Sequence, residues 1–160
     1  MPAAHKGYAA MAHFRSQWER QLGRCESPIE SIFLAQFCAA AIDLGYGVGR
    51  TVKVPAETIV VKPQAWVDRW RVDFLITFDF FGDMIEIVIE CDGHHWHERT
   101  KVQAAKDRAR DRALQSTGYE ILRFTGSEIN GAPLGCASEV LDRIMDFQTA
   151  CFTRAIETAA

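Results

Sequence analysis

The pattern of apolar and polar positions predicts that the chain begins with two helices. In residues 1–24 apolar side chains recur at helical spacing, which predicts a peripheral N-terminal helix that carries Tyr8, Met11, Phe14, Trp18 and Leu22. A second helix starts clearly, because Ser27 can act as its cap, Pro28 suits the first turn and Glu30 can complete a capping box. We expect this helix to reach about Leu44 and to end at Gly45.

The middle of the chain alternates with the period of two that is typical of β-strands. Residues 48–61 predict one or two strands broken at Pro55, and residues 66–81 predict one longer strand. In the longer strand an apolar set that includes Val72 and Phe74 alternates with the set that holds Asp73. Gly82 and the aspartate after it signal a turn, so residues 84–92 should pair back as a hairpin.

The C-terminal part of the chain predicts a helix, a strand and a helix. Residues 98–117 form the helix with a thin stripe of small apolar side chains, and Gly118 ends it. Residues 119–124 predict a short strand, and the final helix carries Val140, Leu141, Ile144, Met145 and Phe147. We therefore predict an α/β fold in which helices flank a mixed sheet, with a core at residues 25–130 and a C-terminal helix at 131–160 packed on it.

Carboxylates gather at the end of the most apolar predicted strand. Glu90 and Asp92 share one strand face with Val88, whereas the alternate positions such as Cys91 take the core face. Asp73 on the preceding strand can lie beside Glu90 through hairpin pairing. Acidic groups there are costly unless a cation neutralises them, and Mg²⁺ prefers carboxylate oxygens. The pair is a minimal Mg²⁺ site for phosphodiester hydrolysis, although acidic residues also solvate strand ends without any such role.

Composition and charge narrow the class of protein. The chain has 160 residues, of which 48% are hydrophobic and 24% charged, with a net charge of -3 and a pI of about 5.9. This balance suits one globular domain. It excludes the class of proteins that coat nucleic acid unspecifically, because those proteins are basic overall. Five cysteines without CxxC spacing indicate free thiols. The chain shows no signal-peptide pattern and no apolar stretch long enough to span a bilayer, so we expect a soluble cytoplasmic protein.

Several short motifs, taken together, resemble one nuclease group. They are Arg71-Val72-Asp73-Phe74-Leu75, then Ile89-Glu90-Cys91-Asp92-Gly93-His94-His95-Trp96-His97, then Asp107, Arg110, Asp111, Leu114, Gly118 and Tyr119, and finally Ile121-Leu122-Arg123-Phe124. In this order they resemble the PD-(D/E)XK nuclease superfamily, and within it the uncharacterised-domain subgroup related to the very-short-patch mismatch repair endonuclease. The resemblance spans roughly residues 25–130. It implies a restriction-endonuclease-like three-layer core with a sheet of about four or five strands.

The resemblance also implies roles for individual residues. Asp73 would be the aspartate and Glu90 the second acid of the motif, both metal ligands, and the Cys91 carbonyl would add a further ligand. The usual lysine falls at position 92, where this chain has Asp92. The proton-transfer role would then pass to Lys101, Lys106 or His97, and we favour His97 because an imidazole exchanges protons near neutral pH. Ser27-Pro28-Ile29-Glu30 also resembles the opening helix of the family, which implies that Glu30 serves the metal site. The capping pattern explains Glu30 equally well on its own.

Other polar and aromatic residues have two interpretations each. On the helix after the motif, Lys106, Arg108 and Arg112 are candidates for phosphate contacts, although a solvated helix face explains them equally well. On the same helix Arg110 and Asp107 look structural. Trp66, Trp70 and Trp96 can stack on bases, but core packing is the favoured interpretation. A zinc site at Cys91, His94, His95 and His97 is disfavoured, because the cysteine shares the predicted core face.

We therefore predict a Mg²⁺- or Mn²⁺-dependent endonuclease that acts on nucleic acid, with DNA favoured over RNA. Two rivals remain. One is a nucleic-acid-binding module that has lost catalysis, which Asp92 in the lysine position favours, and the other is a pure interaction protein. Metal binding by the apo protein separates the enzyme from both.

Overall fold

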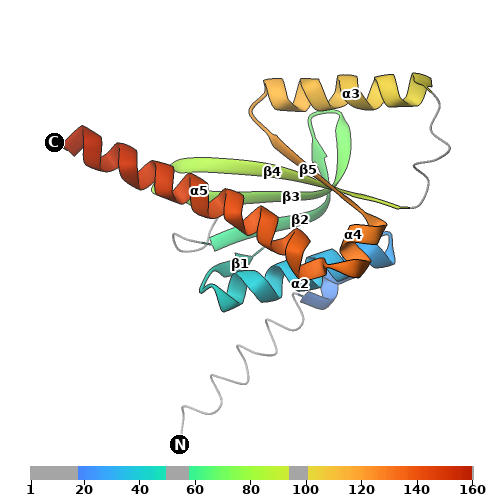
Figure 1. Cartoon of the computed structure of the whole chain (residues 1–160), viewed down its shortest axis with the longest axis horizontal. Helices are drawn as coiled ribbons and strands as arrows, with labels where there is room; N and C mark the ends of the chain where they lie inside the picture. The colour runs from blue at the N-terminus through green and yellow to red at the C-terminus, as the bar shows by residue number, and fades with distance from the viewer. Residues whose placement is uncertain (1–17, 50–57, 94–100, 160) are drawn as a thin grey trace, which may run out of the picture.

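The computed structural model describes residues 18–49, 58–93 and 101–159 (Figure 1). Residues 18–22 are helical, as the sequence predicted for this part of the N-terminal segment. The elements that follow, in chain order, are α2 (Pro28–Asp43), β1 (Gly47–Gly49), β2 (Thr58–Val67), β3 (Trp70–Phe80), β4 (Asp83–Asp92), α3 (Lys101–Ser116), β5 (Glu120–Thr125), α4 (Gly126–Gly131) and α5 (Pro133–Ala159).

The strands form one mixed sheet in the order β1-β2-β3-β4-β5. β1 runs parallel to β2, the β2–β3 and β3–β4 pairs are antiparallel, and β4 runs parallel to β5. The parallel β4–β5 pair needs a crossover, which α3 supplies on one face of the sheet. The predicted α/β fold with a mixed sheet flanked by helices is thereby confirmed.

Helices cover the two faces of the sheet unequally (Figure 1). On one face α2, α4 and α5 pack over the larger core, whose fully buried side chains include Phe33, Phe37, Phe74, Phe78, Ile87 and Ile89. On the other face α3 covers a small cluster of Val67, Val72, Leu75, Val88 and Leu114. The result is three layers, with the sheet in the middle. Among the described helices, none is long and apolar enough to cross a membrane.

The boundaries of several elements follow the local signals. Ser27 caps α2 and accepts a hydrogen bond from the Glu30 backbone N–H at 3.4 Å. The β3–β4 turn places Phe81 and Gly82 at φ values of 53° and 92°, the left-handed backbone that two-residue hairpin turns of type I′ require. The short helix α4, which the sequence analysis did not foresee, begins at a complete capping box of Thr125 and Glu128.

The prediction of one long strand over residues 66–81 is wrong. β2 continues to Val67, the chain reverses at Asp68 and Arg69, and β3 begins at Trp70, which pairs with Val67. Asp68 has a φ of 52°, and aspartate tolerates this left-handed conformation better than most residues. The turn contains neither glycine nor proline, so the strongest punctuation signals are missing from this hairpin.

The sheet forks between β3 and β4. Their pairing runs from Phe80↔Asp83 to Phe74↔Ile89. Beyond this point β3 stays paired with β2 alone, and β4 stays paired with β5 as far as Asp92↔Thr125. Asp73 and Glu90 are the next residues on the two strands, so each stands where the strands part.

The alternation of buried side chains also changes at the fork. Phe74 packs in the larger core, whereas Val72 packs with Leu75 in the small cluster under α3. The predicted sharing of one face by Val72 and Phe74 is therefore wrong. Gln64 on β2, at the corresponding level, has a φ of 51°, which marks a local break in the regular pleat. The tip of the β2–β3 hairpin thereby turns its apolar side toward α3.

Candidate active site

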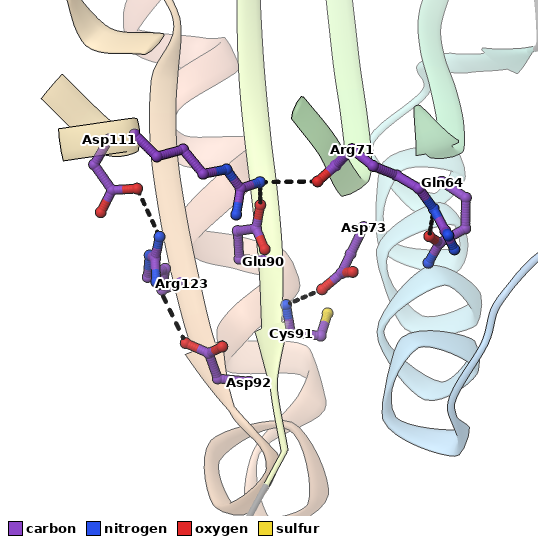
Figure 2. A network of polar contacts seen from close by, with 9 residues as sticks. Gln64, Arg71, Asp73, Glu90, Cys91, Asp92, Asp111 and Arg123 are labelled. Atoms are coloured by element: carbon purple, nitrogen blue, oxygen red, sulfur yellow. Dashed lines mark hydrogen bonds and ion pairs between the residues drawn. The ribbon is translucent and has the colours of Figure 1, made fainter. Parts of the chain in front are cut away.

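A row of polar side chains crosses the sheet at the level of the fork (Figure 2). The pairs Pro63↔Phe74 and Ala65↔Val72 bracket Gln64 and Asp73, which therefore stand opposite each other on β2 and β3. On the other side of the fork Glu90 on β4 pairs with Arg123 on β5. Four strands thus bring an amide, two carboxylates and a guanidinium to one level of the sheet.

Asp73 is held by the strand across the fork. Its Oδ2 accepts a hydrogen bond from the backbone N–H of Cys91 at 2.7 Å. Burial raises the pKa of the Asp73 carboxyl, and this hydrogen bond works in the opposite direction. Its other oxygen, Oδ1, bonds to no residue that the structure describes. A half-buried carboxylate with one oxygen available is a suitable ligand for a cation.

Glu90 is held from α3. Its Oε1 accepts a hydrogen bond from Arg110 Nη2, and the two side chains also form an ion pair. Burial raises the pKa of Glu90 to about 7, even though the Arg110 charge favours the ionised form. Within the described chain nothing bonds to Oε2. Glu90 and Asp73 therefore each have one oxygen engaged and one available.

Arg110 reaches both strands of the fork. Besides Glu90 on β4, its Nη2 donates to the backbone carbonyl of Arg71 on β3 at 2.9 Å. The carbonyl would otherwise point into the opening where β3 has left β4. From the sequence, Arg110 was interpreted as a structural residue of its own helix. That interpretation missed both of these contacts with the sheet.

Glu30 is the most buried acid of the group, with 5% of its surface exposed. Its Oε1 accepts from Ser27 Oγ, and its Oε2 accepts from the Glu26 backbone N–H and from Gln64 Nε2, each at 2.8 Å. In a capping box the Glu30 side chain would accept from the backbone N–H of Ser27. In the structure it accepts from the backbone N–H of Glu26 instead. Glu30 therefore connects the start of α2 to Gln64 on β2.

The two interpretations of Glu30 are separated by substituting glutamine for it. An amide keeps the oxygen that accepts at the helix start but gives up the charge, and it places an NH₂ group against one of three donors. We expect Glu30→Gln to lower the free energy of unfolding by about 1–2 kcal/mol, the usual cost of a mispaired buried donor. Thermal unfolding measures this loss, and Glu157→Gln on the exposed end of α5 is the matched control. A stability equal to that of the wild type would contradict the described network.

If Glu30 serves only this network, cleavage by Glu30→Gln should remain within about threefold of the wild type at limiting Mg²⁺ once stability is allowed for. A much larger loss of activity, repaired by more Mg²⁺, would instead assign Glu30 to the metal site.

Asp92, in the position of the usual lysine, points to the same side of β4 as Glu90. Arg123 Nη1 lies 3.8 Å from Asp92 Oδ2, and Arg123 Nη2 donates to Asp111 Oδ1 at 2.6 Å (Figure 2). Arg123 therefore links the end of β4 to α3. A cationic group is thus present near position 92, but it comes from β5.

The remaining predicted site residues lie in different places. His97 lies outside the described residues, as do His94, His95 and Trp96, and the side chain of Lys101 is not described either. The three candidates for phosphate contacts on α3 are all exposed, namely Lys106, Arg108 and Arg112. Their exposure agrees with both interpretations of that helix face.

The favoured core assignment is wrong for one tryptophan. Trp66 is 70% exposed on β2. Trp70 is half-buried against the small cluster, and the Arg69 guanidinium lies 4.6 Å from its ring centroid. Trp66 leaves the core because the pleat changes at Gln64, which turns alternate side chains of the hairpin tip outward.

Cys91 packs against the larger core, as predicted, and all five cysteines are free thiols. Among the described residues no group of three or more His, Cys, Asp or Glu side chains is arranged to hold a metal ion. A metal at the fork would therefore rest on Asp73 and Glu90 with backbone and water oxygens. Such a sparse set of oxygen ligands suits Mg²⁺ rather than zinc.

Sequence reasoning missed the contributions of Gln64 and Arg71. Gln64 donates to Glu30, and it accepts from Arg71 Nε at 2.8 Å. Arg71 also forms an ion pair with Glu26 before α2. The Arg71-Val72-Asp73 motif was noted, but Gln64 lies in the hairpin that was not predicted, so no local pattern placed it near the aspartate.

The three-layer fold and the acids at the fork define a restriction-endonuclease-like domain. The chain belongs to the restriction-endonuclease family REase_MTES_1575. The model of this family matches residues 49–144, which is more than half of the chain. Membership of this family indicates a nuclease, and hence a nucleic-acid substrate. No curated protein and no solved structure matches the chain. The narrower relation to the very-short-patch endonuclease stays a prediction.

Proposed function

We propose that this protein is a Mg²⁺- or Mn²⁺-dependent endonuclease that hydrolyses phosphodiester bonds, with DNA favoured over RNA as the substrate, in the cytoplasm. The observation that supports it most is the meeting of Asp73 and Glu90 at the fork, each with one oxygen engaged by the protein and one available. Restriction-endonuclease-like proteins generally use divalent metals. Burial without a neutralising cation is costly for such a pair.

The chain fits a divalent cation at this position. Asp73 Oδ1, Glu90 Oε2 and the Cys91 carbonyl would hold it, and the cation when bound would supply charge stabilisation and an acidified water. The raised pKa values of both carboxyls indicate that the fork favours neutralisation of these acids. A proton-transfer partner is still needed. His97 is favoured over Lys101 and Lys106, because an imidazole exchanges protons near neutral pH.

The direct test is a panel of labelled single- and double-stranded DNA and RNA, incubated with the purified protein and Mg²⁺, Mn²⁺ or EDTA. We expect cleavage within the strand that requires Mg²⁺ or Mn²⁺, with DNA cut faster than RNA. Binding without cleavage under every condition would support the rival module that has lost catalysis. Neither binding nor cleavage would support the interaction protein.

The basic face of α3 gives a separate prediction about binding. Arg108 and Arg112 are exposed on the helix that covers the site, so we expect the double change to alanine to weaken DNA binding in EDTA by roughly tenfold. The slope of log K against log salt should fall by about 0.9 for each phosphate that the variant no longer neutralises. A fluorescence titration at several salt concentrations measures both values.

The matched control is the double change Arg143→Ala and Arg154→Ala. These residues are exposed on α5, across the sheet from α3, and replacing them removes the same net charge. If the slope falls by the same amount in the two double variants, the effect belongs to net charge and α3 makes no specific contact.

A further inference from the structure

Arg110, on α3, donates hydrogen bonds to both strands of the fork. A single nitrogen, Nη2, donates to Glu90 on β4 and to the Arg71 carbonyl on β3. The Arg110 side chain is 20% exposed and the Glu90 side chain 13%, so little water competes for this contact. The buried Nε of Arg110 has no hydrogen-bond partner among the described residues. The position of the guanidinium therefore depends on Glu90 and on the Arg71 carbonyl.

The contact between Arg110 and Glu90 involves only one of the two carboxylate oxygens. Arg110 engages Oε1 of Glu90, while Oε2 has no described partner. Across the fork, the Cys91 N–H likewise engages Oδ2 of Asp73 and leaves Oδ1. A carboxylate free of such restraint can chelate a cation with both oxygens, whereas Mg²⁺ functions with few protein ligands and several waters.

We propose that Arg110 is a positioning residue that limits Glu90 to one oxygen toward the metal, so that coordination positions remain for water and the phosphate. The inference rests on the proposed function and deepens it. The same guanidinium places a positive charge beside the metal position, which weakens cation binding. Arg110 therefore lowers the affinity for the metal and, in return, keeps coordination positions free for water and the phosphate.

This role has a signature that a merely structural role lacks. Loss of Arg110 removes a repelling charge and frees the second oxygen of Glu90, so the metal should bind more tightly while turnover becomes slower. A variant damaged in packing alone would bind metal more weakly and turn over more slowly, with both effects following its stability.

The experiment measures Mn²⁺ binding to the metal-free full chain by isothermal titration calorimetry at pH 8, together with turnover at saturating Mn²⁺. We expect Arg110→Met to bind Mn²⁺ about tenfold more tightly than the wild type, because a like charge has gone. Its kcat on the substrate that the wild type cleaves should fall by about a hundredfold, with KM within threefold. Arg110→Lys keeps the charge and should bind Mn²⁺ within about threefold of the wild type.

Arg154→Met is the matched control, because it removes the same charge at an exposed position on α5. It should leave Mn²⁺ affinity and kcat unchanged. If Arg110→Met does not fold, Arg110→Gln takes its place, since it also removes the charge and is polar enough for the half-buried position. Weaker Mn²⁺ binding by the neutral variant overturns the inference, and so does unchanged turnover.

Failure of the proposed function is distinguishable from failure of this inference. If the wild type binds Mn²⁺ but cleaves nothing, the nuclease proposal fails, and tighter binding by Arg110→Met still supports the positioning of Glu90. If neither the wild type nor the variants bind Mn²⁺, both proposals are overturned.

Discussion

Replacement of Asp73 by asparagine, or of Glu90 by glutamine, is expected to lower the rate of Mg²⁺-dependent cleavage by about a thousandfold or more. Metal-ion catalysis supplies several kcal/mol of transition-state stabilisation, and each 1.36 kcal/mol corresponds to about tenfold in rate. The two residues stand at the end of the β3–β4 pairing, and each contributes one available oxygen. In each amide variant the remaining oxygen accepts from its protein donor, so an NH₂ group that does not bind a cation replaces the available oxygen. Single-turnover kinetics with the substrate identified by the panel measures the effect.

The amide variants are chosen because they keep the shape of the side chains. Asp73→Asn retains an oxygen that can accept from the Cys91 N–H, and Glu90→Gln retains one for Arg110. Circular dichroism should therefore show native spectra for both. Asp79→Asn, on β3 near the far hairpin, is the matched control and should cleave at the wild-type rate. Cleavage at that rate by Asp73→Asn or Glu90→Gln would remove the proposed site.

The second large effect concerns the metal-free protein and its stability against pH. The pKa of Glu90 is raised by burial from 4.5 to about 7 in the folded state, so folding favours the protonated form. This contribution to stability is present below about pH 4.5 and is lost as the pH rises to about 7. A shift of this size corresponds to about 3 kcal/mol. The charges of Arg110 and Arg123 lower the pKa of Glu90 and the charge of Asp73 raises it, but burial has the largest effect.

Glu90→Gln removes the titration and isolates the effect. In EDTA the difference in unfolding free energy between the variant and the wild type should be near zero at pH 4. It should reach roughly 2–3 kcal/mol in favour of the variant at pH 8, or roughly 5–10 °C in Tm. Glu157→Gln, on the exposed end of α5, should show no such trend. A difference that stays constant between pH 4 and pH 8 would contradict a raised pKa at Glu90.

Addition of Mg²⁺ provides a check on the link between the two predictions. A ligand that binds only the folded state stabilises it by mass action. Mg²⁺ should therefore raise the Tm of the wild type at pH 8, where Glu90 is ionised, and raise it less at pH 5. Glu90→Gln should respond weakly at both values.

Sequence alone determined the elements whose signals are local. The start of α2 was predicted because Ser27 and Pro28 act within one turn. The β3–β4 hairpin was predicted from a glycine turn between two apolar runs, and it brings Asp73 next to Glu90. The α/β class followed from the order of these elements. These features depend on residues that are near one another in the chain.

The tertiary structure decided everything that depends on packing between distant segments. The β2–β3 turn at Asp68 has no strong breaker, and the exposure of Trp66 follows from that hairpin and from the pleat break at Gln64. Arg110 reaches Glu90 only because α3 crosses the fork, and Gln64 reaches Glu30 only because β2 runs beside the start of α2. Burial raises the pKa of Glu90, and the hydrogen bonds from the Cys91 N–H and from Arg110 each engage one oxygen of an acid and leave the other available. Neither property is visible in the spacing of residues. The acids of the candidate site were therefore readable from sequence, whereas the groups that hold and orient them were not, because hydrogen bonds between side chains on separate elements leave no periodic pattern in the chain.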